Sequence, residues 1–509
     1  MASFTGALAG ALLIVLAVLS VGTSAHGSTS TVCVGSGAGC VGTIQGAVDA
    51  ARDGDMVTIE AGTFNGGVRI DKSVKLVGAG AAATTVKGGG PVLTIGSHSQ
   101  RPLTISIRGI TITGGVSETN PSGRCGADVP RCGPGYLQAT ALAGGVEIGP
   151  RATVTISNSV ISANQARPTV QAPSVTARCP GGPCPFAYGG GGGIDNWGKL
   201  TLVGTTVSDN VAGGGITAQA DGGGILNESG ARLTLLNSTV KGNGVTVSAP
   251  NGRFAAGGAI YVDGGTLAVR GSKISANRAE MAIAMPPTVD VNAACAAICI
   301  ESRASATIRG TLISANVVSG SNSQGNGVWC GGGISTGDGG SFSLANSTVS
   351  NNRVTASAEA TSSKVGDFLA CSGALDLFAA RVRISNSRIV GNTVSARTTS
   401  GAALVVAGAV SPVSPNAVIT KTVFSGNSAK ASSDRGSAVA YGGAIANGNA
   451  LALRRSRVTG NSARAESPNG VAHGGGIFDG QIPGLDQPGR IRRVASVVAR
   501  NTPDQCYQC

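Results

Sequence analysis

The sequence contains few charged and few aromatic residues: 12% of its 509 residues are Asp, Glu, Lys or Arg, and 3% are Phe, Trp or Tyr. Hydrophobic residues make up 41%, and 81 residues are glycine. A disordered chain would be less apolar, and an ordinary globular domain would contain less glycine. The composition therefore indicates a repetitive fold with many tight turns, in which a single domain grows along one axis.

Long apolar runs are also scarce, and the one at the N-terminus is typical of a targeting segment. Residues 7–21 are all Ala, Leu, Ile, Val, Gly or Ser, and small residues follow at 23–25. We expect residues 1–25 to be a signal peptide and residues 26–509 to be secreted as one domain. No Lys or Arg precedes the run, so an uncleaved anchor is the alternative, although about 15 apolar residues are short for a membrane span. No other stretch is long and apolar enough to span a membrane.

Cysteines number twelve, and most of them occur in close pairs. An even, paired count in an exported chain predicts disulfides, although spacing leaves their connectivity open. A redox pair or a zinc site is the alternative, but no histidine lies beside any of these cysteines. The cysteines are Cys33 and Cys40, Cys125 and Cys132, Cys179 and Cys184, Cys295 and Cys299, Cys506 and Cys509, with Cys330 and Cys371 left over.

The region 33–115 is expected to form an N-terminal cap and the first turns of a coil. Ile44, Ala47 and Val48 share one face at helical spacing, and the sequence Asp-Gly-Asp at 53–55 ends that helix. Short runs rich in β-forming residues follow, separated by glycine, with no helical pattern between them. These runs are residues 56–60, 68–70, 74–77, 92–95 and 103–113.

The motifs of this region occur in a recognisable order: T-I-Q-x-A-V-D-A-A, G-D-x-V-x-I, G-T-F, V-x-I-x-K-S-V-x-L-V-G-A-G and I-x-G-I-T-I-T-G-G. The succession resembles the opening of pectin-lyase-like proteins. The resemblance implies an all-β, right-handed parallel β-helix, or solenoid, with a short N-terminal capping helix.

Residues 116–509 contain a repeat of the form apolar, x, apolar, x, Asn/Gly, Ser/Thr, x, Val/Ile, Ser, x, Asn. The spacing between its final asparagines runs from 33 to 46 residues. The variation lies after each asparagine, so we expect every rung to carry a loop insertion there, and roughly a dozen rungs in all. The repeats end at Asn164, Asn210, Asn243, Asn277, Asn316, Asn352, Asn392, Asn427, Asn461 and, in degraded form, Asn501.

Alternation within the repeat predicts which residues form the core. Leu233, Leu235 and Val240 should point into the coil and the residues between them outward. The recurring asparagine suits a tight bend, because Asn tolerates the left-handed conformation, and its amide can bond to the next Asn along the coil. Cys330 and Cys371 each lie four residues before an equivalent apolar residue, which places them on successive rungs within disulfide reach.

The repeats are also similar to those of polymorphic outer-membrane proteins and related surface adhesins. The similar segments are G-G-A-I at 442–445 and F-x-x-N at 424–427. That resemblance implies a non-catalytic surface protein whose loops carry the binding. It is an alternative to an enzyme.

Acidic residues fall in two outward columns. Glu147 and Asp195 occupy equivalent positions on neighbouring rungs, and Glu228, Asp263 and Glu301 occupy a second position further along. Such carboxylates can bind calcium through oxygen, or share a proton as an acid and base pair. The simpler interpretation is that they are solvated turn residues.

Basic residues form a second outward set, weighted toward the C-terminal half. With a formal charge of +13, this set predicts attraction to a polyanion, and for an exported protein an acidic polysaccharide is a more natural partner than nucleic acid. The alternative is a charged face that prevents edge-to-edge aggregation. The candidate substrate-binding residues are Arg270, Lys273, Arg309, Arg383, Arg388, Arg454 and Arg457, and Arg492 and Arg493 extend the set.

No segment of the sequence matches a catalytic motif of pectin-lyase-like enzymes. Pectate lyases hold calcium with carboxylates near a basic residue. The nearest equivalents in this sequence are the metal candidates Glu228, Asp263 and Glu301 and the basic residues Lys273 and Arg309. Glu147 and Asp195 are the remaining catalytic candidates. Aromatic platforms for sugars are few, namely Trp197, Trp329, Tyr188, Tyr261 and Phe478. We expect a monomeric, secreted protein that binds acidic polysaccharide, with residual lyase activity left open. An adhesin-like protein and a calcium-dependent lyase are the alternatives.

Overall fold

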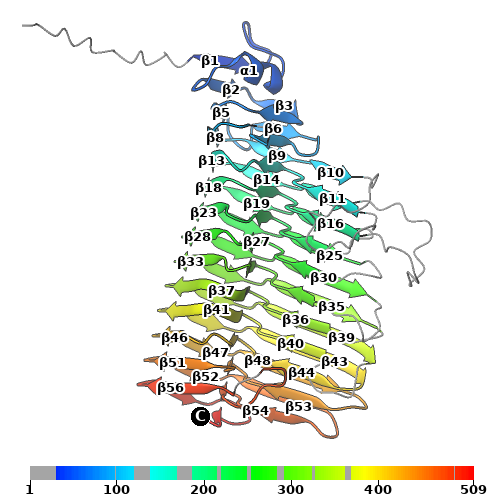
Figure 1. The fold of residues 1–509 in the computed structure, drawn as a ribbon, viewed down its shortest axis with the longest axis vertical. Coiled ribbons are helices and arrows are strands. Elements are labelled where there is room, and N and C mark those ends of the chain that lie inside the picture. The colour runs from blue at the N-terminus through cyan, green and yellow to red at the C-terminus, as the bar shows by residue number, and fades with distance from the viewer. Residues whose placement is uncertain are drawn as a thin grey trace, which may run out of the picture.

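The computed structural model describes residues 30–97, 99–119, 138–168, 186–214, 219–248, 254–283, 292–323, 327–360, 368–485 and 488–509. These residues form a long stack of parallel strands that coils from the N-terminal end to the C-terminal end of the molecule (Figure 1). The predicted all-β, parallel β-helix solenoid is confirmed. The expected signal peptide, residues 1–25, lies outside the described residues.

Helix α1 (Ile44–Ala50) covers the N-terminal end of the coil. Thr43 caps it by accepting a hydrogen bond from the Gly46 N–H at 3.1 Å, and Ile44, Ala47 and Val48 are buried against the coil. The helix contacts β1 (Thr31–Val34), β2 (Met56–Ile59) and β4 (Val68–Ile70). It therefore shields the apolar end of the core from water, as the amphipathic pattern predicted.

One representative rung shows the path of the chain. It runs through β22 (Ile225–Asn227) and β23 (Arg232–Leu236), turns into β24 (Thr239–Lys241) and continues through β25 (Gly244–Val247) to β26 (Phe254–Ala256). Strands β22 and β23 belong to a 25-stranded sheet, which we call the main sheet, and β24 belongs to a 13-stranded back sheet. Strands β25 and β26 belong to two further sheets of ten strands each.

The main coil has an aliphatic core built from stacked equivalents. Leu200, Leu233 and Leu267 are direct neighbours in register and are almost fully buried. Leu235 and Val240 are also fully buried, so the predicted inward positions are confirmed. Each such side chain contributes about 1.5–3 kcal/mol relative to exposure in water.

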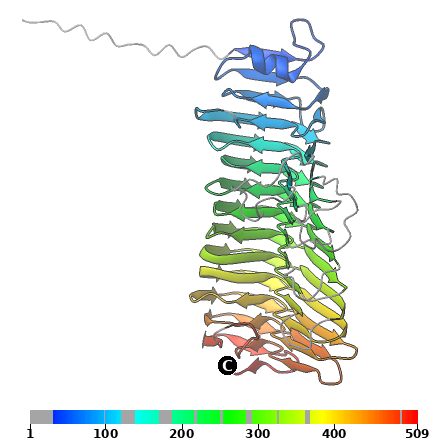
Figure 2. The ribbon, with the colours of Figure 1, turned by 45° about the vertical axis from the view of Figure 1, so that its right-hand side comes forward.

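The segments after each asparagine are not loops where the structure describes them, and that expectation was wrong. They form the two ten-stranded sheets, here called the first and second wing sheets, which lie beside the coil (Figures 1 and 2). The wing sheets share a core of mostly small side chains, among them Ala212, Ala220, Val245, Ala255 and Ala279. Alanine favours strands only weakly, so burial between the two sheets rather than strand propensity accounts for these strands.

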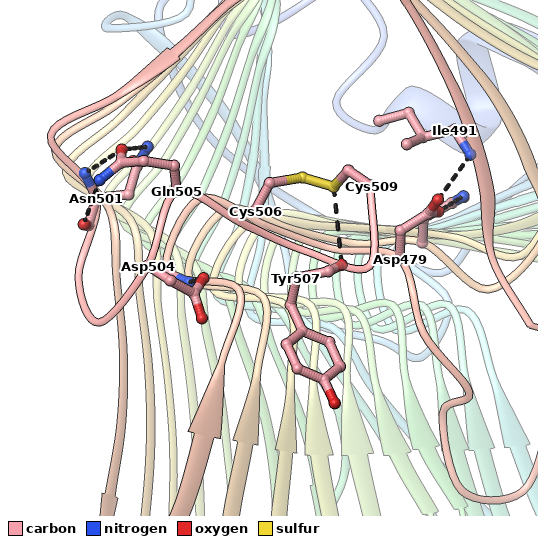
Figure 3. The surroundings of a disulfide bond; sticks show 10 residues. Asp479, Ile491, Asn501, Asp504, Gln505, Cys506, Tyr507 and Cys509 are labelled. Carbon is pink, nitrogen blue, oxygen red and sulfur yellow. Dashed lines mark hydrogen bonds between the residues drawn. A yellow bond between two sulfur atoms is a disulfide. The ribbon is translucent and has the colours of Figure 1, made fainter.

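The recurring asparagines form a continuous hydrogen-bonded ladder inside the coil. In each rung the Asn Nδ2 donates to the Oδ1 of the next asparagine at 2.8–3.0 Å, and each Asn N–H donates to the same oxygen. The ladder ends where Asn501 donates to Gln505 Oε1 (Figure 3). The predicted stacking is confirmed, but the left-handed residue is the one before the asparagine, such as Ala163, Ala276 or Ala315.

Four of the expected disulfides are formed in the described part of the chain. They join Cys33 to Cys40, Cys295 to Cys299, Cys330 to Cys371 and Cys506 to Cys509. Cys330 in β36 (Gly327–Cys330) pairs in register with Cys371 in β40 (Phe368–Cys371), so the bond links successive rungs as predicted. The other expected pairs, Cys125 with Cys132 and Cys179 with Cys184, lie outside the described residues. The helical part of the described chain is too short to span a membrane.

Candidate functional site

The basic candidates all lie on outer faces of the coil and are exposed. Arg270 at the end of β28 (Thr266–Arg270) and Arg309 at the end of β33 (Ser305–Arg309) are direct neighbours in register. Parallel strands are about 4.8 Å apart, so their side chains lie side by side. Lys273 occupies the back sheet, where Leu312 and Thr348 separate it from Arg388. The expected stripe is therefore interrupted.

Toward the C-terminal end the basic residues become dense. They gather where the main sheet turns into the back sheet, over β46 (Ala417–Thr420), β51 (Ala450–Arg454) and β56 (Arg490–Val494) and the back-sheet strands that follow them. Residues 417–425, 450–459 and 490–500 contain no Asp or Glu. We call this set the basic corner, and it comprises Lys421, Arg454, Arg455, Arg457, Arg492 and Arg493, all exposed. Arg383 and Arg388 lie on the adjoining rung.

The acidic candidates lie on a different edge of the main sheet. Glu147 in β12 (Val146–Ile148) pairs in register with Asp195 in β17 (Ile194–Asn196). Asp263 in β27 (Ile260–Asp263) pairs with Glu301 in β32 (Ile298–Glu301), and Glu228 follows β22 on the rung between these pairs. The two predicted columns thus run along five consecutive rungs.

The acidic and basic candidates do not meet. Asp263 ends β27, whereas Arg270 lies at the far end of β28, the next strand along the chain. The five residues of β28 span roughly 13–16 Å, because an extended strand rises about 3.3 Å per residue. In the part of the chain that the structure describes, Glu228, Asp263 and Glu301 also do not bring three carboxylate oxygens within 4.8 Å of one another. The expected calcium triad with an adjacent base is not assembled.

The second wing sheet faces the short main-sheet strands that carry these acids. Leu226 and Tyr261, which point out from the coil, pack with Ala256 and Ala294 of the second wing sheet. The strands β16 (Phe186–Gly190) and β21 (Gln219–Asp221) belong to this sheet. They add Tyr188 and Asp221 to the same region, and Asp221 is buried. We call its carboxylates the acidic seam, which comprises Glu147, Asp195, Asp221, Glu228, Asp263 and Glu301.

Burial changes the chemistry of two carboxyls in the acidic seam. Asp195 is 1% exposed, and burial, with a smaller contribution from Glu147, raises its pKa to about 7 against the hydrogen bond from Trp197. Burial also raises the pKa of Glu228 to about 8, assisted by the charges of Asp195, Asp263 and Asp221. Desolvation disfavours the charged form, and neighbouring negative charges add to this effect. Both carboxyls therefore titrate near neutral pH.

The aromatic candidates separate into different environments. Trp197 is 41% exposed, and its Nε1 donates to Asp195 Oδ2 at 2.9 Å. Tyr188 lies near the same carboxylates, and burial raises its pKa well above its usual range. Trp329 is fully buried in the wing core, so it offers no platform. Phe478 stacks on Tyr441, with ring centroids 4.2 Å apart, near the C-terminal end.

Asp221 and its partner Gln219 are the residues of this region that sequence reasoning missed. Gln219 Nε2 donates to Asp221 Oδ2 at 2.7 Å, and both side chains are buried. They lie on a wing strand that was expected to be a loop. The pattern that could have revealed this strand is the alternation of Gln219, Ala220 and Asp221 immediately before a G-G-G-I segment.

Comparison with known proteins identifies no relative: no family model, no curated protein and no solved structure matches this chain. Its function must therefore be inferred from the chemistry of the two charged surfaces.

Proposed function

We propose that the protein is an exported β-helix of the pectin-lyase-like class that binds an acidic polysaccharide on its basic corner. The observation that carries the proposal is the concentration of six exposed basic residues, with no acidic residue in the same strands. The opening motifs and the parallel β-helix support membership of the class. The disulfides are compatible with export, since such bonds persist in oxidising compartments.

The basic corner has a geometry suited to a linear polyanion. Successive rungs repeat at about 4.8 Å along the coil axis. Arg454 lies in register with Thr420 and Val494, so the positive charges of the three rungs are staggered across the corner rather than aligned in one column. Guanidinium groups bind carboxylate and sulfate oxygens through paired hydrogen bonds. Each exposed contact contributes little by itself, and several contacts on a rigid surface are needed for useful affinity.

Binding without cleavage fits the arrangement better than lyase chemistry does. A lyase needs its base beside the group that polarises the substrate acid, and Arg270 is separated from Asp263 by the length of β28. The basic corner itself contains no carboxylate. We therefore propose a binding role, with the corner as the site of attachment.

The test compares two double charge reversals of equal size in the mature protein. Arg454→Glu with Arg457→Glu changes the basic corner, and Lys199→Glu with Arg232→Glu changes an exposed neighbouring pair at the opposite end of the long main-sheet strands. Binding to polygalacturonate is measured by calorimetry at low salt, and release of unsaturated uronate is followed by absorbance. We expect the corner variant to bind about tenfold more weakly, the control to change less than about twofold, and no product to form.

Two results contradict the proposal. Equal losses in the two variants would show that only net charge matters. Unchanged binding by the corner variant would remove the basic corner as the site.

A further inference from the structure

The acidic seam carries carboxyl groups along five consecutive rungs. Glu147 and Asp195 are stacked in register, as are Asp263 and Glu301, with Glu228 between the two pairs. Asp195 lies in register with Leu226, two residues before Glu228, so the seam has two columns offset by roughly 7 Å across the axis. At about 4.8 Å per rung, the two columns together extend roughly 19 Å along the coil axis. A row of this length suits a linear ligand parallel to the axis.

Positive side chains of the described residues do not offset the charge at the centre of the seam. The pKa of Glu228 is raised by burial and by the charges of Asp195, Asp263 and Asp221, and no Lys or Arg contributes in the opposite direction. Asp195 is 1% exposed, and its Oδ1 has no hydrogen-bond partner in the described structure. A buried carboxylate normally has its hydrogen bonds satisfied or a positive group nearby. An external cation would supply what these two carboxyls lack.

The distribution of the carboxylates argues against a single metal ion. A metal needs several oxygen ligands around one point, and in the described part of the chain no three carboxylate oxygens of the seam lie within 4.8 Å of one another. Positive charges spaced along an organic ligand match the row better.

Trp197 indicates a second chemical feature of the ligand. Its indole is 41% exposed although the indole N–H is fixed by Asp195 Oδ2 at 2.9 Å. Tryptophan provides a large apolar surface and is the aromatic side chain that attracts cations most strongly. A ring-shaped, cationic unit can use both properties, whereas an aliphatic polyamine or a lysine-rich peptide can use only the second.

We infer that the acidic seam binds a linear amino-sugar polymer. Its protonated amines lie against Glu147, Glu228 and Asp263, which are partly exposed, and one sugar ring packs on Trp197. Asp195 is a positioning residue, because its Oδ2 accepts the indole N–H and so fixes the ring. The inference does not depend on the proposed function, because the basic corner lies at the other end of the long main-sheet strands.

The test measures binding of a β-1,4-linked glucosamine hexamer and of its fully N-acetylated counterpart by calorimetry near neutral pH. The acetylated hexamer has the same backbone and no charge. Glu147→Gln with Glu228→Gln should weaken binding of the glucosamine hexamer about tenfold, and Trp197→Ala about fivefold. Glu359→Gln, on the exposed outer face of β39 (Arg353–Ala360), is the matched control and should have no effect. Far-UV circular dichroism and thermal melting verify that each variant folds.

Spermine separates the amino-sugar from a simple polyamine. We expect spermine to bind more weakly than the glucosamine hexamer and to lose less affinity than the hexamer on Trp197→Ala, because it uses only the attraction of the indole for cations. The inference is overturned if the acetylated hexamer binds as well as the charged one, if the double Gln variant binds normally, or if spermine binds more tightly than the sugar.

Discussion

Asp195→Asn should remove a pH dependence from the stability of the coil. In the wild type the carboxyl has a pKa of about 7 when folded and about 3.9 when unfolded. Between these values the unfolded state releases a proton that the folded state keeps, so the free energy of unfolding falls as pH rises. At about 1.36 kcal/mol per unit, the loss between about pH 5 and pH 7 amounts to roughly 2 kcal/mol, and it levels off above the folded pKa.

Asparagine preserves the shape and still offers Oδ1 to the Trp197 N–H. The variant should therefore have a flatter stability profile across the same interval, apart from the contribution of Glu228, whose folded pKa of about 8 gives a slope of the same sign. Urea unfolding at several pH values measures both profiles. Because a fixed structural cost of the amide shifts the whole curve, the slope rather than the absolute stability is the quantity to compare.

Fluorescence gives an independent measurement at Trp197 itself. The protein contains two tryptophans, so Trp329→Phe leaves Trp197 as the only indole that emits. Its emission should titrate near pH 7 in this background and lose that transition when Asp195→Asn is added. A wild-type stability profile that is flat between about pH 5 and pH 7, or a fluorescence transition that survives Asp195→Asn, would refute the argument that burial holds this carboxyl neutral.

Two further predictions concern the internal supports of the coil. Asn316→Ala removes a donor to Asn352 Oδ1 at 2.8 Å and the acceptor for the Asn277 amide. It should lower the free energy of unfolding by about 3–5 kcal/mol, because buried groups lose their partners. The control, exposed Asn416→Ala, should cost under about 0.5 kcal/mol, and equal losses in urea unfolding would contradict the ladder's role. Replacing Cys330 and Cys371 by Ala should cost about 4 kcal/mol, against about 2 kcal/mol for Cys295 and Cys299, because the first bond closes a loop of 41 residues and the second one of 4. Thermal melting of the two variants under oxidising conditions compares them, and the reverse order would contradict the loop-closure argument.

Sequence reasoning succeeded where a property depends on the repeat. The inward Leu233, the stacked asparagines and the Cys330 to Cys371 bond all follow from counting equivalent positions, because parallel strands place those positions one above another. The neighbouring pairs Glu147 with Asp195 and Arg270 with Arg309 follow in the same way.

It failed where the structure depends on contacts between sheets. The wing strands contain alternating alanines such as Ala220 and Ala255, which carry a weak strand signal. Without the wings, sequence reasoning interpreted Asp195 as a solvated turn residue, whereas it lies in strand β17. With them it is buried, as is Asp221, and its unusual pKa follows from that burial. The acidic seam is thus a property of packing that spacing along the chain does not reveal.

The distribution of charge gives the strongest reason to regard both surfaces as functional. Inward positions are constrained by stacking, but outward positions can carry any polar residue, and a surface that serves only solubility mixes charges of both signs. Here five acids of the main sheet gather with Asp221 of the second wing sheet, and six basic residues lie at the other end of the long main-sheet strands near the C-terminal end. Like charges on neighbouring strands repel one another and reduce stability. Rows of like charge are therefore expected to persist where ligands of opposite charge bind them, and the rigid coil holds the two rows on separate edges.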